Sequence, residues 1–593
     1  MSISLEQLSA QMRRGEQVPL RHTMQVVLTL SIPSILQQIV VTAVEYIDAA
    51  MVGHIGASAT ASIGIVSSST WLMHGMLAGL YMSFAIQVAQ YLGADRQDDA
   101  RGVLRQSMIF NLVVGLAAAA FGIGISRFLP GWLGADPSLQ ADASAYFAIW
   151  SASLPFLMIM GTYSSMLRSS GDALTPGLIS VLTCVLDVIF NFCLINPTRE
   201  MVVFGRTMTV WGLGWGVPGA ALGTALATAI SGVLTLAILL LRDGPLCIRK
   251  PGSWHITKAC LQNLWKVGAP LAAERAVLSS AQVLLVRIVS GLGTTAIAAN
   301  SLGVSAESLC YMAGYGIQDA SLALVGQAVG ANRRDMAKNF AWLCTGMGIG
   351  IMALTGVGMY IFAPNLMGIF TADAAVIALG AQVLRIEALA EPMFGASIVA
   401  SGAMQGAGDS TGCFVLNLVS MWGIRLTLAS LLAPHFGLVG VWMAMSFELT
   451  MRGVLFLVIP VTIGLVPLWI LSWRMNLLTL GEEEARSMGV NTRLLRFIVI
   501  LCATLLTAAS VAVSGMIGWV GLVIPHFCRI LFGYDYRRLI PAAALFGASF
   551  LIIVDDIARL ATAGEIPLGI LTAFVGAPIF LYLILTGGAR RGN

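Results

Sequence analysis

The chain has 593 residues, of which 57% are hydrophobic and only 10% are charged, and its formal net charge is +4. An ordinary soluble domain carries about 25% charged residues, and a soluble protein of this size has too much surface to hide so many apolar side chains. This composition excludes a soluble enzyme, a nucleic-acid-binding protein and a disordered chain. The nine cysteines include no CxxC pair and lie mostly in apolar runs, which predicts membrane-buried thiols and no metal site. A helical membrane protein with many spans remains.

The first apolar run starts at about Met24, after a polar segment 1–23 that does not resemble a cleavable signal peptide. Twelve runs are long enough to span a bilayer: 24–50, 60–92, 103–126, 143–165, 176–195, 217–241, 260–290, 296–329, 339–363, 375–403, 413–433 and 437–460. Arginine and lysine gather before the first run and after the second, sixth and eighth, which predicts a cytoplasmic N-terminus. The charged segment 196–215 is the exception, and we expect it to form a longer outside hairpin with Trp211 and Trp215 at the membrane interface.

The chain contains an internal repeat. VAQYLGADRQDDA at 88–100 aligns with VGQAVGANRRDMA at 325–337, with seven identical residues at an offset of 237. The same offset pairs Asp172 with Asp409, and both follow a glycine in a short turn, where we expect them to cap a helix. Polar residues in loops match here, so chance similarity between apolar segments does not explain the repeat.

The repeat predicts an all-α polytopic membrane protein built from two six-helix lobes. We expect the first lobe at 24–241, a cytoplasmic linker at 242–258 and the second lobe at 259–460. Because six is an even number, both lobes start on the same side and are related by an axis along the membrane normal.

Several motifs resemble those of the MATE (multidrug and toxic compound extrusion) family, closest to its DinF-like branch, over residues 20–458. They are the two repeated loops, YIDAAMVGHIG at 46–56, RSSGDALTP at 168–176 and QGAGD at 405–409. The resemblance implies a non-enzymatic antiporter of the cell (inner) membrane that needs no cofactor. It would expel organic cations, drugs or other amphipathic metabolites against a proton or sodium gradient.

Carboxyl groups inside spans are candidates for ion coupling, because an ionisable group there costs about 2.5–3.5 kcal/mol on insertion scales. Glu45 and Asp48 are three residues apart on the first span and share a helix face, and Asp187 lies on the fifth span. Desolvation and a second carboxyl nearby both disfavour the charged form, so such groups can bind and release a proton. The same oxygens could bind sodium. The alternative is a static polar pair that braces two helices.

The resemblance supports two of these residues. Asp48 in YIDAAMVG and Asp187 in VLDVIFN match the acidic residues that the family carries on its first and fifth spans. Thr183, one turn before Asp187, replaces a family asparagine, and Asn191 lies one turn after it. We expect Thr183 and Asn191 to be supporting polar groups.

The second lobe lacks these acids, since the counterparts of Asp48 and Asp187 are Leu285 and Ile424. Glu274 on the seventh span is a possible second-lobe cation site, although it could simply pair with a neighbouring residue. Phe394 stands where the sodium-linked NorM-like branch has an acidic residue, which favours protons. Four further carboxyls lie nearer span ends or small-residue faces and are less favoured: Glu307, Asp319, Glu387 and Glu391.

Residues 461–593 lie beyond the repeat. NLLTLGEEEARSMGV at 476–490 and GMIGWVGLVIPHFCRILFGYDYRRLIPAAALFGA at 515–548, with GEIPLGILTAFVGAPIFLYLIL at 564–585, resemble the C-terminal half of FecCD/BtuC-type permeases. Those permeases belong to ABC importers for iron-siderophores, haem and cobalamin. We expect about four more spans and a cytoplasmic C-terminus; the spans are 494–514, 517–532, 539–560 and 566–586.

The acidic segment Glu482, Glu483, Glu484 with Gly489 resembles the loop by which such permeases dock on an ATP-binding subunit. Glutamates at a helix N-terminus are also ordinary dipole chemistry, so the docking role is one of two readings. No Walker A motif occurs, and the chain therefore does not hydrolyse ATP itself. We favour an accessory segment attached to an exporter; the alternatives are a subunit of an ATP-driven siderophore or cobalamin importer, and a siderophore exporter.

Overall fold

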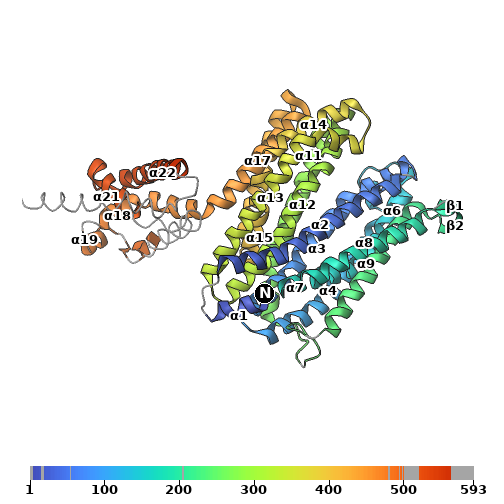
Figure 1. Ribbon diagram of the computed structural model, residues 1–593, viewed down its shortest axis with the longest axis horizontal. Helices are drawn as coiled ribbons and strands as arrows, with labels where there is room; N and C mark the ends of the chain where they lie inside the picture. Colours follow the sequence, from blue (N-terminus) through green and yellow to red (C-terminus); the bar gives the residue numbers. More distant parts are fainter. Residues whose placement is uncertain are drawn as a thin grey trace, which may run out of the picture. The chain divides into compact units, whose positions relative to one another are not determined.

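The computed structural model is helical almost throughout (Figure 1). The described residues are 5–14, 19–53, 55–203, 206–242, 244–250, 252–478, 481–489, 491–492, 494–496, 498–499 and 520–561. They form two compact units, Met1–Phe456 and Leu457–Asn593. The predicted all-α polytopic membrane fold is confirmed, whereas the domain limits drawn from the sequence stay a prediction.

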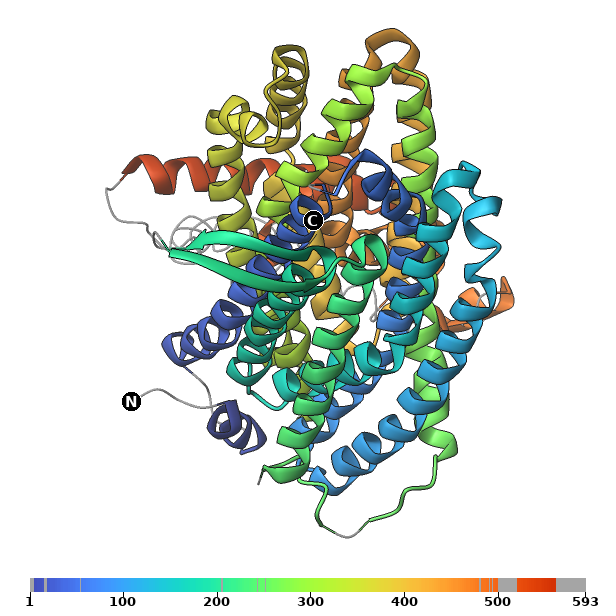
Figure 2. The ribbon, with the colours of Figure 1, turned by 90° about the vertical axis from the view of Figure 1, so that its right-hand side faces the viewer.

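The first lobe of unit 1 follows a short N-terminal helix, α1 (Leu5–Arg13). Its helices are α2 (Leu20–Gly53), α3 (Ala57–Gly93), α4 (Gln97–Ser126), α5 (Leu129–Trp132), α6 (Pro137–Ala152), α7 (Leu154–Ser169), α8 (Leu174–Ile195) and α9 (Gly216–Leu241). Between α8 and α9 the expected hairpin is an antiparallel pair of strands, β1 (Pro197–Val203) and β2 (Arg206–Leu213), visible in Figure 2.

The second lobe repeats this order. Its helices are α10 (Lys258–Asn263), the π-helix η1 (Leu264–Gly268), α11 (Ala269–Ser290), α12 (Thr294–Gly330), α13 (Arg334–Phe370), α14 (Ala374–Ala388), α15 (Glu391–Ala407), α16 (Ser410–Leu418), the π-helix η2 (Val419–Leu426) and α17 (Thr427–Ile470). Gly437, at φ 59°, interrupts α17 between the eleventh and twelfth predicted spans, and the helix continues past residue 460.

Every one of the twelve predicted spans of unit 1 coincides with helix, although the helices are divided differently. Seven helices of the described chain are long and apolar enough to cross a membrane, or eight if the bent pair α6–α7 is one span. The remaining predicted spans are interrupted or less apolar. The tenth, for example, is split between α14 and α15 at residues 389–390.

The backbone of the two lobes confirms the repeat. Asp95 and Asn332, which correspond to each other in the repeat, have φ values of 62° and 56° and are the only non-glycine residues of the described chain with positive φ. This left-handed conformation is uncommon for residues with a side chain, and asparagine and aspartate tolerate it best. Gly171 and Gly408, which also correspond, have φ values of 97° and 92°. The matching loops therefore turn in the same way.

The two expected helix caps are also present. Asp172 accepts a hydrogen bond from the Thr175 backbone N–H at 3.0 Å, and Asp409 accepts one from the Gly412 N–H at 2.9 Å. Burial raises the pKa of Asp172, but its bonds from Thr175 and the Arg242 guanidinium outweigh burial and hold that pKa below its usual value. Both aspartates are therefore capping residues in the turns that follow α7 and α15.

The lobes meet along a seam made by α2, α3, α11 and α12. A Cβ on Gly79 of α3 would overlap the backbone of Ala272 on α11, and a Cβ on Gly316 of α12 would overlap the backbone of Ile35 on α2. The repeat offset relates these two contacts to each other. In Figure 1 the helices of the lobes converge near α1 and diverge towards α14 and the hairpin β1–β2.

The closest approach lies at the C-terminal ends of α3 and α12. A Cβ on Gly93 would overlap the carbonyl oxygen of Gln327, and a Cβ on Gly330 would overlap that of Gln90. All four residues belong to the repeated VxQxxGA motif. The motif glycines therefore allow the two backbones to touch.

Unit 2 contains α18 (Ser472–Leu478), α19 (Glu482–Ser487), α21 (Val520–Phe532) and α22 (Tyr536–Ala561). Helices α21 and α22 pack on each other through a small core of Ile524, Cys528 and Leu539. They coincide with the predicted spans 517–532 and 539–560. The predicted span 566–586 lies outside the described residues, and so does most of 494–514, of which only 494–496 and 498–499 are described.

Replacement of Gly330 by alanine tests the crossing of α3 and α12. The added methyl group meets the Gln90 carbonyl, and overpacking of this kind costs about 1–3 kcal/mol. We expect a lower unfolding temperature of the purified protein. Gly346→Ala on α13 is the matched control, because nothing lies within 4 Å of its added Cβ and alanine favours a helix. Equal unfolding temperatures for Gly330→Ala and the wild type would contradict the close crossing.

Candidate functional site

Helices α2 and α8 pack together and place Asp48 beside Asp187. Asp48 is half-buried, and Asp187 is buried, with 3% of its surface exposed. The Asp48 carboxyl and the Thr224 hydroxyl of α9 lie near the Asp187 carboxyl, and neither Asp187 oxygen has a hydrogen-bond partner among the described residues. The two aspartates predicted as the coupling pair are thus neighbours, although they lie far apart in the sequence.

Asn191 fixes the position of Asp48. Its Nδ2 donates a hydrogen bond of 2.9 Å to Asp48 Oδ1, and the residue is only 1% exposed. One helical turn separates Asn191 from Asp187, so α8 presents an amide and a carboxyl to the same region of α2. The predicted supporting role of Asn191 has this contact in its favour.

Thr183 is placed differently. Its hydroxyl donates to the Ile179 carbonyl at 2.8 Å and lies 2.7 Å from the Ser231 hydroxyl of α9. These contacts tie α8 to α9, and neither partner is acidic. The structure therefore does not bring Thr183 to the aspartate pair.

Two adjacent carboxyls have a defined chemistry. Two negative charges side by side repel each other, and the low dielectric around them strengthens that repulsion, so such a pair favours holding one proton between its members. A donor such as the Asn191 amide stabilises the carboxylate that remains charged. The arrangement can therefore bind one proton and exchange it when its surroundings change.

A cavity of about 490 Å³ opens beside this pair in the first lobe. It is lined by carboxyl, hydroxyl and amide groups together with aromatic rings: Glu45, Asp48, Val52, Thr60, Ile63, Gly64, Ser67, Thr70, Trp71, His74, Tyr146, Trp150, Asn191, Ala220 and Thr224. Glu45 and Asp48 both face it, as their spacing on α2 predicts. Asp48 belongs to the lining, whereas Asp187 does not. Carboxylates beside Trp and Tyr faces suit an organic cation with apolar groups.

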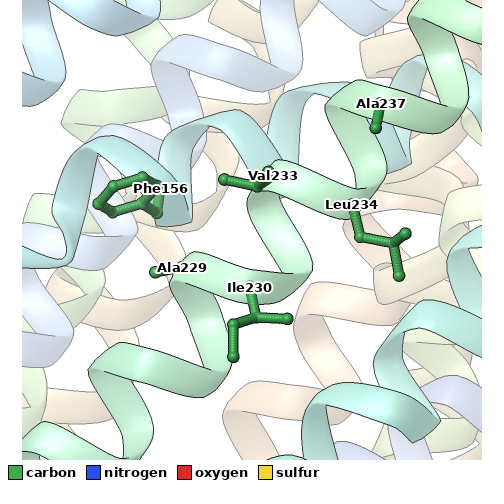
Figure 3. A pocket seen from close by; sticks show the side chains of 6 residues that line it. All are labelled: Phe156, Ala229, Ile230, Val233, Leu234 and Ala237. Carbon is green, nitrogen blue, oxygen red and sulfur yellow. The ribbon is translucent and has the colours of Figure 1, made fainter.

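A second hollow lies on α7 and α9 and differs in character (Figure 3). Its lining is Phe156, Ala229, Ile230, Val233, Leu234 and Ala237. The lining side chains are all apolar, and Ile230 and Val233 are 42% and 55% exposed. A surface of this kind suits the hydrocarbon of a bilayer and offers no group for a coupling ion.

Glu274 of the second lobe takes part in a similar contact. Its Oε1 accepts a hydrogen bond of 2.8 Å from Asn417 Nδ2, and its side chain is 5% exposed. The two partners are 143 residues apart, which is the separation of Asp48 and Asn191. The repeat offset would place the counterpart of Asp48 at Leu285. Glu274 lies eleven residues before that position, so the second-lobe pair is displaced by eleven residues from the first-lobe pair. The signal in the sequence is the shared separation of 143 residues between an acid and an asparagine. The repeat offset of 237 residues does not reveal this pair.

A buried ion network that the sequence reasoning missed joins η2 to α17. Glu448 is 0% exposed; Arg425 lies 2.6 Å from its Oε2, Arg452 lies 2.7 Å from its Oε1, and Ser420 also bonds to it. The signal was present, because all three charged residues fall inside predicted spans. Glu448 is itself a carboxyl inside a predicted span but is absent from the candidates above, although Arg452 lies one helical turn after it.

Three of the less favoured carboxyls are also buried in the second lobe. Glu387 and Glu391 are 0% exposed, and no donor among the described residues reaches their carboxyl oxygens. Glu307 of α12 is 5% exposed and lies close to both. Glu387 and Glu391 lie on either side of the break between α14 and α15, and Glu391 packs against Gly356 of α13, which fits the expected small-residue face. Asp319, by contrast, lies 3.5 Å from Arg168 in an ion pair across the seam.

The proposed docking segment of unit 2 is a short helix, α19, that ends before a glycine. Glu484 is exposed, and Gly489 has a φ of 83° in the turn that follows. The side chains of Glu482 and Glu483 lie outside the described part of the structure. An exposed glutamate on a short helix followed by a tight turn fits a contact surface and equally fits ordinary capping.

Comparisons with known proteins separate the two parts of the chain. The MatE family model matches residues 33–193, which contain Asp48 and Asp187. "Probable multidrug resistance protein NorM" of Thermotoga maritima is 25% identical over 438 residues, which are 72% of this chain and 89% of that protein. The crystal structure "MATE in complex with MaL6" superposes with a TM-score of 0.68 at 19% identity, covering 75% of this chain and 96% of that one. Unit 1 therefore has the MATE fold.

The FecCD transport family model matches residues 347–586. "Probable iron chelatin transport system permease protein" of Helicobacter pylori is 35% identical over 231 residues, which are 37% of this chain and 71% of that protein. The chain belongs to the FecCD transport family and also carries a MatE domain. Its FecCD match begins within α13, so it extends over helices that fold as the second lobe of unit 1. The resemblances read from the sequence motifs are both confirmed.

Replacement of Glu448 by glutamine tests the buried ion network. The change removes the charged carboxylate that pairs with both the Arg425 and the Arg452 guanidinium groups, and loss of one partner of a buried pair costs about 3–5 kcal/mol. We expect a lower yield of monodisperse protein and a lower unfolding temperature. Glu274→Gln is the control, because that carboxyl has a neutral partner and glutamine can keep its hydrogen bond to Asn417. A Glu448→Gln protein as stable as Glu274→Gln would refute the structural role.

Proposed function

We propose that unit 1 is a secondary active transporter that exports small organic molecules in exchange for protons. The observation that carries this proposal is the adjacent carboxyl pair, Asp48 and Asp187, at the wall of a cavity in a MATE fold. The proposed substrates are amphipathic or cationic compounds, because the cavity combines carboxyl groups with aromatic faces. The named relative, a multidrug resistance protein, supports this class.

The proposed exchange follows from electrostatics. With the cavity empty and wet, the Asp48–Asp187 pair gives up a proton to water and becomes more negative. A cationic or strongly polar substrate then binds beside Asp48, and Glu45 adds negative charge on the same wall. A proton that binds to the pair removes this attraction and favours release. Because proton and substrate compete for one set of charges, movement of one drives the other.

A proton fits this site better than sodium. A sodium site needs several oxygen ligands, whereas Asn191 presents its N–H₂ group, a donor, to Asp48. Sodium remains the alternative coupling ion, and Glu274 with the amide of Asn417 is the alternative second-lobe cation site. The proposed location is the cell (inner) membrane, with both termini in the cytoplasm and lipid around the helices.

Asp48→Asn tests the coupling role directly. The change removes the titratable group and keeps the volume, so we expect proton-driven exchange to fall by at least about tenfold, as for loss of an essential proton-transfer group. Proteoliposomes with an imposed pH gradient and ethidium as the exported probe give the measurement. Asp172→Asn is the matched control, because asparagine also caps helices and the turn lies outside the spans. Wild-type exchange by Asp48→Asn would remove this residue from the mechanism.

A second candidate function concerns unit 2. The likeness to an iron chelatin permease supports a role in ATP-driven import of siderophores or cobalamin, with α19 as the surface for an ATP-binding subunit. Export of a siderophore by unit 1 would connect the two parts. We favour the accessory reading, because the part of the FecCD match before residue 457 consists of helices that fold as the second lobe of unit 1.

Removal of residues 461–593 separates these functions. If unit 1 transports alone, ethidium efflux from cells by the shortened protein will equal that of the full chain. It will collapse with an uncoupler and survive ATP depletion, because a proton gradient drives it. Uptake of a ferric siderophore that needs both the tail and a partner ATPase would instead contradict the exporter proposal.

A further inference from the structure

The N-terminal helix α1 touches both lobes at the ends where they converge (Figure 1). Arg13 donates to the Leu92 carbonyl at 3.2 Å and pairs with Asp95 at 3.1 Å, both in the repeat loop of the first lobe. Arg333, in the matching loop of the second lobe, donates to the Met12 carbonyl at 2.9 Å. One turn of α1 therefore bridges the two copies of the repeated motif.

Met12 anchors this bridge. Its side chain is 1% exposed and belongs to a core cluster with Val26 and Val27 of α2 and with Ile317 and Leu324 of α12. A short helix in water does not hold its fold alone, because nucleation costs more than the few hydrogen bonds return. The nine residues of α1 therefore depend on this docking for their helical form.

Beneath α1, two glutamines cross the seam in opposite directions. Gln90 Nε2 of the first lobe donates to the Gly406 carbonyl at 3.1 Å, and Gln327 Nε2 of the second donates to the Ser169 carbonyl at 2.7 Å. The repeat offset relates the two donors to each other and the two acceptors to each other. Both carbonyls lie in the last turn of a helix, α15 or α7, where they have no partner within the helix.

These bonds give the glutamine of the VxQxxGA motif a structural role in joining the lobes. That glutamine takes no part in the Asp48–Asp187 site. Each glutamine joins its own lobe to the other through a carbonyl that would otherwise face solvent or a void. The seam is further closed by the ion pair between Arg168 of α7 and Asp319 of α12, and Gln37 of α2 accepts from the same arginine at 3.1 Å. The bonds of Gln90 and Gln327 and the Arg168–Asp319 ion pair must all break for the lobes to part at this end, whereas Gln37 and Arg168 belong to the same lobe.

We propose that α1 is a strap that holds the lobes closed at the ends of α3 and α12, over a reciprocal lock formed by Gln90 and Gln327. The strap must release Met12 before these ends separate. Its part in transport rests on the proposed function, since alternating access needs this end to open in one stage of the cycle. The strap itself rests only on the contacts described.

Hydrogen exchange of the full-length protein in lipid nanodiscs tests the strap. Met12→Asp makes docking of α1 unfavourable, so peptides covering residues 85–95 and 322–332 open more often and exchange faster, by about fivefold or more. Peptides from the opposite ends, 57–64 and 294–301, keep their wild-type exchange, which shows that the lobes remain folded. Gln327→Ala, which removes one bond of the lock, gives the same pattern.

Gln11→Ala is the matched control on the same helix, and we expect wild-type exchange from it. Arg13→Ala removes both contacts with the first-lobe loop and gives a second reading if Met12→Asp does not fold. Unchanged exchange at 85–95 and 322–332 in folded Met12→Asp or Arg13→Ala would overturn the strap. Because this measurement needs neither substrate nor gradient, a loss of transport in Asp48→Asn and a failure of the strap are separate results.

Discussion

The structure of unit 1 depends on the contact between α3 and α12, where two glycines let backbones meet. Lipid gives helices little reason to associate, so membrane proteins rely on close packing of small residues. Gly93 and Gly330 supply that packing at one end, and Gly79 and Gly316 supply it midway along the same helices. Each glycine packs against the backbone of the other lobe. The repeat relates the contacts in pairs, so the two lobes contact each other at equivalent positions. The aspartate pair and its cavity lie away from this contact, near the other end of α2 and α3.

Much of this arrangement was readable from the sequence, because its causes are local or repeated. The constant repeat offset showed which loops correspond, and the left-handed Asp95 and Asn332 bear this out in the backbone. Asp48 and Asp187 stood out because carboxyl groups are rare in apolar runs. The motif resemblance matched each of them to a family residue, but their proximity depends on the packing of α2 on α8, which periodicity does not reveal.

Other features depended on packing between distant segments and were missed. Glu387 and Glu391 were among the less favoured carboxyls, yet both are fully buried on either side of a break at 389–390 that the apolar run 375–403 does not reveal. Thr183 looked like a partner of Asp187 by spacing, yet the neighbouring hydroxyl of Ser231 holds it elsewhere. In the network around Glu448, Arg452 lies one turn away on the same helix and could be paired by spacing, whereas the contact with Arg425 needs η2 to meet α17.

The displacement between the acid–amide pairs of the two lobes has an electrical consequence. Eleven residues of helix correspond to about 16 Å, roughly half of the hydrocarbon thickness of a bilayer. The pair Glu274–Asn417 therefore lies at a different depth from Asp48–Asn191, although both lobes cross the membrane in the same sense. A charge held at one depth experiences a different share of the membrane voltage from a charge at the other, and a full crossing is worth about 2.3 kcal/mol per 100 mV. Because the two repeats have diverged, a charge at the acid–amide pair of one lobe experiences a different fraction of the membrane potential from a charge at the pair of the other lobe, although the two backbones are similar.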